Sequence, residues 1–189
     1  SRAQDQSKVV CFNSEYGATR QWAEASSLPY KNIGVTHHLD VKYYKEKYPH
    51  KKVIYFPWGA SKSDIDYQAK EKLYDAVITA RCHYACNHDN YDRRRSIESM
   101  VLPLLDMNIA IYGGDIGPCS WVNVPGVTHQ YKGIFNHWDF PRILSQAKLY
   151  VGISWKYTTG GYSVQIPRAM SVGIRIIWQS TLGGSFEAF

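Results

Sequence analysis

Residues 160–178 read as a complete turn, helix and strand, and this order restricts the fold more than any other stretch of the chain. Two adjacent glycines open the turn, and Ser163 is a suitable N-cap residue for the helix that follows. Pro167 falls in the first turn of this helix, where a missing N–H costs little, and Gly173 suits the left-handed position after its end. The apolar run at 174–178 then predicts a buried strand, so the segment has the pattern of one repeat of an α/β sheet.

A helix that begins behind a glycine turn presents free N–H groups and the positive end of its dipole, a combination that binds phosphate. The same arrangement also serves as an ordinary connection between strand and helix in many α/β proteins. The segment alone therefore leaves phosphate binding and a plain structural turn as equal alternatives.

The alternation of strands and helices continues along the whole chain. Apolar runs predict strands at residues 8–13, 32–36, 52–56, 74–80, 108–112, 148–154 and 174–178. Helical patterns are expected at residues 21–25, 41–48, 92–105, 138–147 and 163–173, and residues 60–72 read as a polar connector or surface helix. Strands that alternate with helices in this way predict a parallel sheet covered by helices on both faces.

Ligands of such sheets bind beyond the carboxyl ends of the strands, which all meet at one edge. The turns expected at this edge contain basic and glycine residues, namely Arg81, Gly113, Gly114, Lys132, Gly160 and Gly161. Their convergence on one edge is a stronger functional signal than any single pair of glycines.

The composition is that of a folded protein with a preference for anionic partners. The chain has 189 residues, 44% of them apolar, which suits one domain or one and a half and argues against disorder. No apolar run is long enough to span a membrane and the first residues do not resemble a signal peptide, so a cytoplasmic location is expected. The net charge of +6 favours sugar nucleotides, nucleic acid or anionic lipid as partners.

The four cysteines are too few and too scattered for a disulfide scaffold, which fits a reducing compartment. Cys82 and Cys86, with His83 and His88 nearby, have a metal-like spacing but lack a second spaced pair. Buried or incidental cysteines are therefore favoured over a zinc site.

Two further clusters each allow a functional and a structural interpretation. His37 and His38 follow an expected strand, and since neighbouring side chains of an extended chain point to opposite sides, at most one would face a cleft. Arg93, Arg94 and Arg95 open an expected helix, where positive charge opposes the dipole, so phosphate binding by at least one of them competes evenly with a solvated face. The tryptophans suit stacking on sugars or bases, but core packing is the simpler explanation for most of them.

The order of elements from about residue 74 to residue 178 resembles the C-terminal, donor-binding Rossmann-like domain of GT-B glycosyltransferases. That family commonly carries the motif E-G-F-G-x-x-x-x-E-A-M-A-x-G, and the matching positions here are Tyr162, Ser163, Ala169, Met170 and Gly173. The other landmarks, in chain order, are a strand that leads to a basic residue, two arginines that open a helix, Ile-Tyr-Gly-Gly at a strand end, a Phe-Pro helix and the strand Ala-Lys-Leu-Tyr-Val-Gly-Ile-Ser.

Both acidic positions of the family motif are missing. Gly160 stands at the first and Arg168 at the second, where the family's glutamate holds the ribose hydroxyls of the nucleotide. An arginine cannot accept these hydrogen bonds. Arg168 would then face a phosphate or a sugar carboxylate, or be a solvated helix residue, and Gln165 or a backbone carbonyl near Thr159 would hold the ribose.

Residues 53–60 are similar to the strand-Pro-x-Gly junction between the two domains of the family. The resemblance implies three parts: residues 1–59 as the end of an N-terminal, acceptor-side domain, 60–73 as a connector, and 74–189 as the nucleotide-sugar-binding domain. Two complete Rossmann domains need about twice the length of a typical domain, so the chain reads as a truncated piece or an unusually compact relative.

The resemblance implies a glycosyltransferase, of the hexosyl or pentosyl type, that uses a UDP- or GDP-sugar as substrate and needs neither a metal ion nor a further cofactor. His37 is the candidate catalytic residue, and the implied donor site comprises Arg81, Arg94, Gly113, Gly114, Lys132, Gly160, Gly161, Tyr162, Ser163, Gln165 and Arg168. The acceptor, whether a glycan, a protein or DNA, and the oligomeric state stay open.

Two alternatives remain on the same fold. One is a non-catalytic module that binds a nucleotide or nucleic acid, and the other is a phage-type glycosyltransferase that acts on modified DNA bases. The basic sequence pI of about 9.1 permits both.

Overall fold

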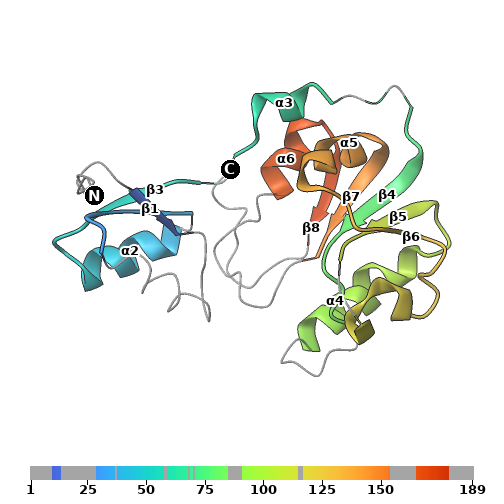
Figure 1. Cartoon of the computed structure of the whole chain (residues 1–189). Coiled ribbons are helices and arrows are strands. Elements are labelled where there is room, and N and C mark those ends of the chain that lie inside the picture. Colours follow the sequence, from blue (N-terminus) through green and yellow to red (C-terminus); the bar gives the residue numbers. More distant parts are fainter. Residues whose placement is uncertain are drawn as a thin grey trace, which may run out of the picture. The chain divides into compact units, whose positions relative to one another are not determined.

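The computed structural model describes residues 10–13, 29–36, 38–57, 59–67, 69, 71–84, 91–114, 117–153 and 165–178. The chain forms two compact units, and its described part passes into the second unit at Gly59 (Figure 1). The predicted boundary between residues 59 and 60 lies next to this division. None of the described helices is long and apolar enough to cross a membrane.

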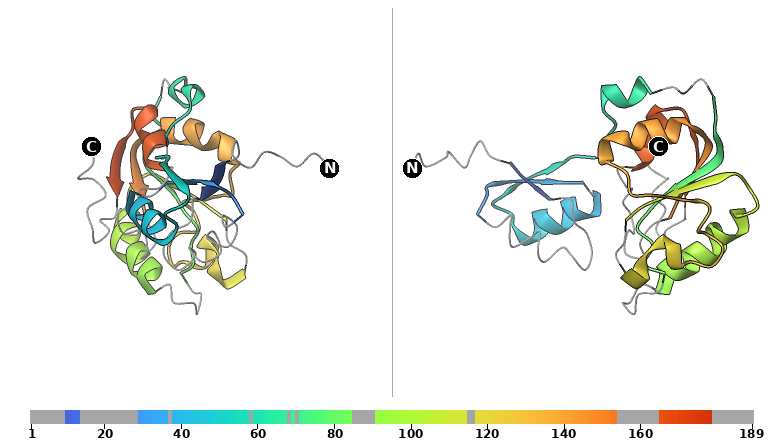
Figure 2. Two further views of the ribbon diagram at one scale, coloured as in Figure 1. Left: turned by 90° about the vertical axis from the view of Figure 1, so that its left-hand side faces the viewer. Right: turned by 45° about the vertical axis from the view of Figure 1, so that its right-hand side comes forward.

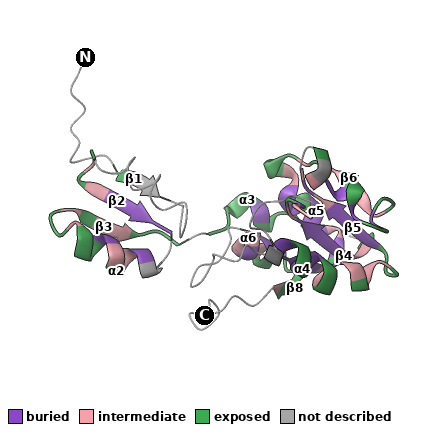
Figure 3. Ribbon diagram, turned by 90° about the horizontal axis from the view of Figure 1, so that it is seen from below, coloured by how far each residue is buried: buried purple, intermediate pink, exposed green. Residues whose placement is uncertain are grey.

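The first unit is a three-stranded parallel sheet in the order β1-β2-β3. Its strands are Val10–Asn13, Asn32–Val35 and Lys52–Tyr55, and helix α2 (His38–Lys47) connects β2 to β3. Alternation along β2 sends Ile33 and Val35 to one face, where both are fully buried in a cluster with Tyr44 of α2. Figure 3 shows β2 as the buried middle strand of this sheet.

The second unit holds a five-stranded parallel sheet in the order β6-β5-β4-β7-β8 (Figure 1). In chain order the strands are β4 (Tyr74–Thr79), β5 (Ile109–Tyr112), β6 (Tyr131–Gly133), β7 (Ala147–Gly152) and β8 (Arg175–Trp178). The chain first moves outward from β4 to β5 and β6, and then returns to the other side of β4 for β7 and β8. This reversal places the topological switch point between β4 and β7.

Helices cover both faces of this sheet (Figure 2). Neighbouring residues of β4 point to opposite faces, so Ile78 packs against α4 (Tyr91–Met100) while Val77 packs against α5 (Phe140–Ser145) and α6 (Gln165–Ser171). The remaining helical segments are α3 (Lys62–Ile65) and 3-10 turns at Leu102–Leu104, Gly117–Cys119, Trp121–Asn123 and His137–Asp139.

The expected fold class, a Rossmann-like parallel sheet flanked by helices, is confirmed. Two details of the prediction are wrong. The helix expected over residues 92–105 ends at Met100 and gives way to a 3-10 turn, because Pro103 lacks the N–H that another helical turn requires. The strand expected at 174–178 is present as β8, but it is not buried: it pairs with β7 alone among the described strands, and its residues alternate between exposed and half-buried. The helical turn expected at 21–25 lies outside the described residues.

Candidate functional site

The carboxyl ends of β4, β5 and β7 lie side by side at one edge of the sheet in the second unit. The Ala80 N–H, just past β4, donates to the Tyr112 carbonyl at the end of β5 (3.0 Å). Because β7 pairs in parallel with the other side of β4, its end at Gly152 belongs to the same edge. The predicted turn at Gly113 is therefore on this edge, whereas the turn at Gly160 lies outside the described residues.

Gly113 is required by close packing of β5 on β4. Its φ of 151° lies in the region that favours glycine, and a Cβ at this position would lie 1.8 Å from the Ala80 carbonyl oxygen. Its N–H donates to the Gly133 carbonyl (3.1 Å) and its carbonyl accepts from the Tyr131 hydroxyl (2.8 Å). At Gly114 a Cβ would lie 3.1 Å from Ile134. Packing thus accounts for Gly113, whereas the exposed Ile134 side chain leaves room to adjust at Gly114. Donor binding by both glycines stays a prediction.

Gln165 opens α6 and reaches the switch point. Its side-chain Oε1 accepts a hydrogen bond from the Tyr150 hydroxyl of β7 (2.7 Å), and that hydroxyl is 3.0 Å from Oγ1 of Thr79 at the end of β4. Complete burial raises the pKa of the Tyr150 phenol, so Tyr150 stays neutral and can donate to Gln165. A chain of three side chains thus joins the ends of β4 and β7 to the first turn of α6.

Arg81 is an exposed cation at this edge. It lies two residues beyond the end of β4 and makes no hydrogen bond or ion pair with any residue that the structure describes. Since β4 is the central strand and borders the switch point, the Arg81 guanidinium is available there to an anion.

The three arginines at the start of α4 differ in their burial and in their contacts. Arg94, the residue assigned to the donor site, is exposed, pairs with Glu98 one helical turn later (2.9 Å) and lies over the Tyr84 ring. The hydrogen bond from Arg94 lowers the pKa of Glu98. Arg93, by contrast, is only 5% exposed, and its Nη1 donates to the Ile153 carbonyl just past β7 (2.7 Å). Arg93 therefore brings a buried positive charge to the switch point.

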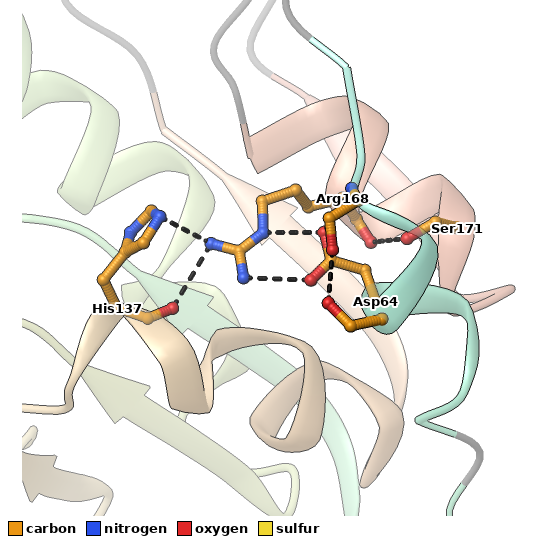
Figure 4. A network of polar contacts seen from close by, with 6 residues as sticks. Asp64, His137, Arg168 and Ser171 are labelled. Carbon is orange, nitrogen blue, oxygen red and sulfur yellow. Dashed lines mark hydrogen bonds and ion pairs between the residues drawn. The ribbon is translucent and has the colours of Figure 1, made fainter.

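Arg168, at the position where the resemblance expects a glutamate, forms a buried ion pair with Asp64 of α3 (Figure 4). Its Nε and Nη2 donate to the two carboxylate oxygens of Asp64 at 3.0 and 3.1 Å. Its Nη1 is 2.9 Å from Nε2 of His137 and 3.3 Å from the His137 carbonyl oxygen. The guanidinium also lies over the Phe140 ring, 5.1 Å from its centroid.

These contacts correct one interpretation of Arg168. With 6% of its surface exposed it is not a solvated helix residue. All three guanidinium nitrogens already have partners within the second unit, so in this structure Arg168 ties α6 to α3 and to the His137 turn. A contact between Arg168 and donor phosphate, which remains a prediction, would require this network to rearrange.

The other assigned residues are not brought to the switch point or lie outside the described residues. Lys132 is exposed on β6, two strands from β4, and its Nζ donates to the His129 carbonyl (3.1 Å). His37, Gly160, Gly161, Tyr162 and Ser163 are outside the described residues.

The described residues include no cluster of three or more His, Cys, Asp or Glu side chains suited to a metal ion. Cys82 is outside any disulfide and is fully buried in the core beside α4, as the interpretation of buried cysteines expects. Cys119 is disulfide-bonded, which the expectation of a reducing compartment did not foresee.

Two residues that shape this region, Asp64 and Tyr150, were missed by the sequence analysis, and the burial of a third, Arg93, was not predicted. Asp64 had a detectable signal, since Ser61 and Asp64 have capping-box spacing and the Ser61 N–H donates to the Asp64 carboxylate (3.1 Å). Arg93 lay within a recognised arginine run, but only the structure separates its buried side chain from its two exposed neighbours. Tyr150 had no distinguishing signal, because it lies within an apolar strand.

No protein-family model matches this chain, and no curated protein matches it in sequence. Solved structures do match its fold. The crystal structure of TarM superimposes with a TM-score of 0.59 at 12% identity, covering 93% of this chain and 37% of that one. The pneumococcal O-GlcNAc transferase GtfA, solved with UDP and GlcNAc, matches with a TM-score of 0.56 at 15% identity, covering 89% and 34%.

The Anabaena protein Alr3699/HepE, solved with UDP and glucose, matches with a TM-score of 0.50 at 14% identity, covering 94% of this chain and 54% of that one. The chain thus spans about a third to a half of the structures that it resembles. At these identities the likeness concerns the fold, and it confirms the expected GT-B type with its Rossmann-like sheets.

Proposed function

We propose that this chain forms the donor-binding part of a glycosyltransferase that moves a sugar from a UDP- or GDP-sugar to an acceptor. The nucleotide diphosphate would lie at the carboxyl edge of β4, β5 and β7. One observation carries this proposal: the exposed Arg81 follows the central strand at the topological switch point and has no partner among the described residues. The two matching structures that hold UDP support a uridine nucleotide as the ligand.

Transfer of the sugar leaves negative charge on the diphosphate, and positive groups held beside it stabilise the transition state. The Arg81 guanidinium offers paired N–H donors that match the geometry of a phosphate. Arg93 adds a second, buried positive charge at the end of β7. We include metal independence in the proposal, because these side chains supply the charge that a metal ion would otherwise provide.

The ribose requires hydrogen-bond acceptors, and Arg168 cannot provide them. Gln165 carries a side-chain carbonyl oxygen in the first turn of α6, the kind of acceptor that Arg168 lacks, and Gln165 is therefore the proposed ribose contact. The assignments of His37 as a catalytic residue and of the glycine turn before α6 as a phosphate contact remain predictions.

A non-catalytic nucleotide-binding module is the second candidate, and the Arg168–Asp64 ion pair favours it. The position that would hold the ribose instead holds α6 to α3, as expected of a fold kept after its catalytic contacts were lost. Turnover separates the two candidates, since both bind the nucleotide but only the enzyme releases it from a sugar nucleotide.

A panel of UDP- and GDP-sugars tests the proposal. Thermal unfolding of the chain should be shifted upward by UDP or GDP and their sugars, and not by a matched concentration of inorganic phosphate. Release of nucleoside diphosphate should then be measured for every donor that shifts unfolding, with and without EDTA and with glycan, protein and DNA acceptors. Release that survives EDTA supports the enzyme, binding without release supports the module, and no shift by any nucleotide contradicts both.

A further inference from the structure

Five lysines of the first unit gather at the amino edge of its sheet, and we call this surface the lysine edge: Lys31, Lys45, Lys47, Lys51 and Lys52. The ranges 29–36 and 38–57 hold six lysines and two acidic residues, an excess of four positive charges, while the whole chain carries a net charge of +6. Much of the basic character of the protein therefore lies in one short part of the first unit.

The topology explains why these lysines converge. Lys52 opens β3 and Lys31 immediately precedes β2, and the Lys52 N–H donates to the Lys31 carbonyl (2.9 Å), so both lie where the parallel strands begin. Helix α2 connects two parallel strands and must run back toward this edge. The last turn of α2 therefore delivers Lys45 and Lys47 to the same edge.

Two lysines of the lysine edge contact the same aromatic ring, that of Tyr48. The ammonium groups of Lys47 and Lys51 lie 5.7 and 5.6 Å from the centroid of its ring. Lys51 also donates to the Tyr30 carbonyl (2.8 Å), next to Lys31. Tyr44 stacks on the Tyr48 ring at 6.2 Å, so this aromatic ring is already in contact with protein groups.

Three lysines of the edge carry charge that no described group neutralises. Lys31, Lys45 and Lys52 are exposed and make no side-chain hydrogen bond or ion pair with a described residue. The two acidic residues nearby do not offset them, because Asp40 is 1% exposed in the first turn of α2, at its other end, and Glu46 pairs with Lys42 (3.9 Å). Like charges held together in this way repel one another unless an anion binds.

We infer that the lysine edge docks the phosphodiester backbone of a nucleic acid duplex. A duplex presents one negative charge per about 1.7 Å of its axis, which suits several ammonium groups gathered at one edge. Recognition of single strands uses open aromatic faces, and the Tyr48 ring is covered by Tyr44 and two lysines. Stable anchoring to a membrane combines such charge with an apolar group, whereas the exposed Tyr55 and Phe56 lie at the opposite end of β3.

If the chain transfers a sugar as proposed, a DNA or RNA duplex is the partner that binds on its acceptor side. Duplex binding is measured without a sugar donor. A chain that does not bind the duplex can therefore still bind UDP in its second unit. The reverse also holds, because loss of UDP binding does not alter the charge of the first unit.

The test compares two triple variants of the whole chain. Lys31→Ala, Lys45→Ala and Lys52→Ala together remove the three unpaired charges of the lysine edge. Lys62→Ala, Arg95→Ala and Arg175→Ala remove three exposed charges of the second unit and serve as the control. Binding of a labelled duplex of about 20 base pairs is measured by fluorescence anisotropy between about 50 and 200 mM salt, the range over which phosphate contacts weaken. Far-UV circular dichroism and thermal unfolding verify that both variants fold.

Wild type and control should bind the duplex with affinity that falls as salt rises. The lysine-edge variant should bind at least about tenfold more weakly at the lowest salt, with a salt slope reduced by about two to three, since each phosphate contact contributes about 0.9. Equal binding by all three proteins contradicts the inference, as does absence of duplex binding by wild type. Retention on phosphatidylserine vesicles without duplex binding would contradict it in favour of a membrane surface.

Discussion

Arg168 and Asp64, 104 residues apart in the chain, form a two-pronged ion pair whose side chains are 7% and 5% exposed. The pair joins α6, which begins at the switch point, to α3, near the start of the second unit (Figure 4). A buried charge that loses its partner is costly, so this contact fixes both helices on the same side of the sheet.

Asp64→Ala should destabilise the second unit by about 3–5 kcal/mol, because it leaves the Arg168 guanidinium buried without its carboxylate. Equilibrium unfolding in urea measures the change. The matched control is Asp139→Ala, which removes the exposed Arg142–Asp139 pair (3.2 Å) and should cost less than about 1 kcal/mol. If both variants lost the same free energy of unfolding, burial would not make the Arg168–Asp64 pair more important for stability than an exposed pair.

Arg168→Glu restores the residue type of the glycosyltransferase motif but should not restore a ribose site. The new carboxylate would face Asp64 in a buried setting, and two like charges there repel. We expect a loss of stability at least as large as that of Asp64→Ala, partly recovered in the exchange variant Asp64→Arg with Arg168→Glu. A stable Arg168→Glu protein that binds UDP more tightly would show instead that Arg168 blocks a functional ribose site.

Gly113→Ala should lower the free energy of unfolding by about 3 kcal/mol or more, because the added Cβ would meet the Ala80 carbonyl oxygen and the backbone has a positive φ. Gly59→Ala is the control, since no atom lies within 4 Å of the position that its Cβ would take, and it should change stability by less than about 0.5 kcal/mol. A mild effect at Gly113 would mean that β5 and β4 can separate at their ends without cost.

The buried Tyr150 predicts a loss of stability at alkaline pH. Its pKa is raised by burial, so the neutral phenol stabilises the fold fully below the unfolded pKa of about 10, and this contribution is lost as pH rises above that value. Wild type should lose up to about 1.4 kcal/mol per pH unit from this group above about pH 10, and Tyr150→Phe should not. Urea unfolding at several pH values measures the slopes. The control is Tyr67→Phe at an exposed tyrosine, and its slope should follow that of wild type.

The spacing of the apolar residues and the residue types at the turns were enough to predict the fold class. The residues of β4 alternate between two helical layers, and Gly173 has the positive φ of 70° expected after α6. Strand β6 was missed, because three residues are too few for a pattern. The exposure of β8 was also missed, since an apolar run does not reveal that its strand lies at an edge of the sheet.

The candidate site was harder to predict than the fold. The sequence places Arg81 and Gln165 near the carboxyl edge. Arg94 and Lys132 contact residues three or four positions away in the chain, whereas the partner of Arg168 is 104 residues away. Arg168 is the clearest case, since its carboxylate partner lies in a stretch read as a polar connector. Pairing between distant charged residues leaves no periodic signal in a single sequence.

Isothermal titration of the whole chain with UDP tests the central claim most directly. Wild type should bind, and Arg81→Ala should weaken binding by about 1–3 kcal/mol, the scale of a lost charged hydrogen bond. Arg175→Ala, an exposed arginine at the opposite edge of the same sheet, should leave affinity unchanged. Weaker binding in Arg81→Ala alone is the result that the account predicts. Absence of UDP binding by wild type, or equal affinity of all three proteins, would contradict a donor site at the switch point.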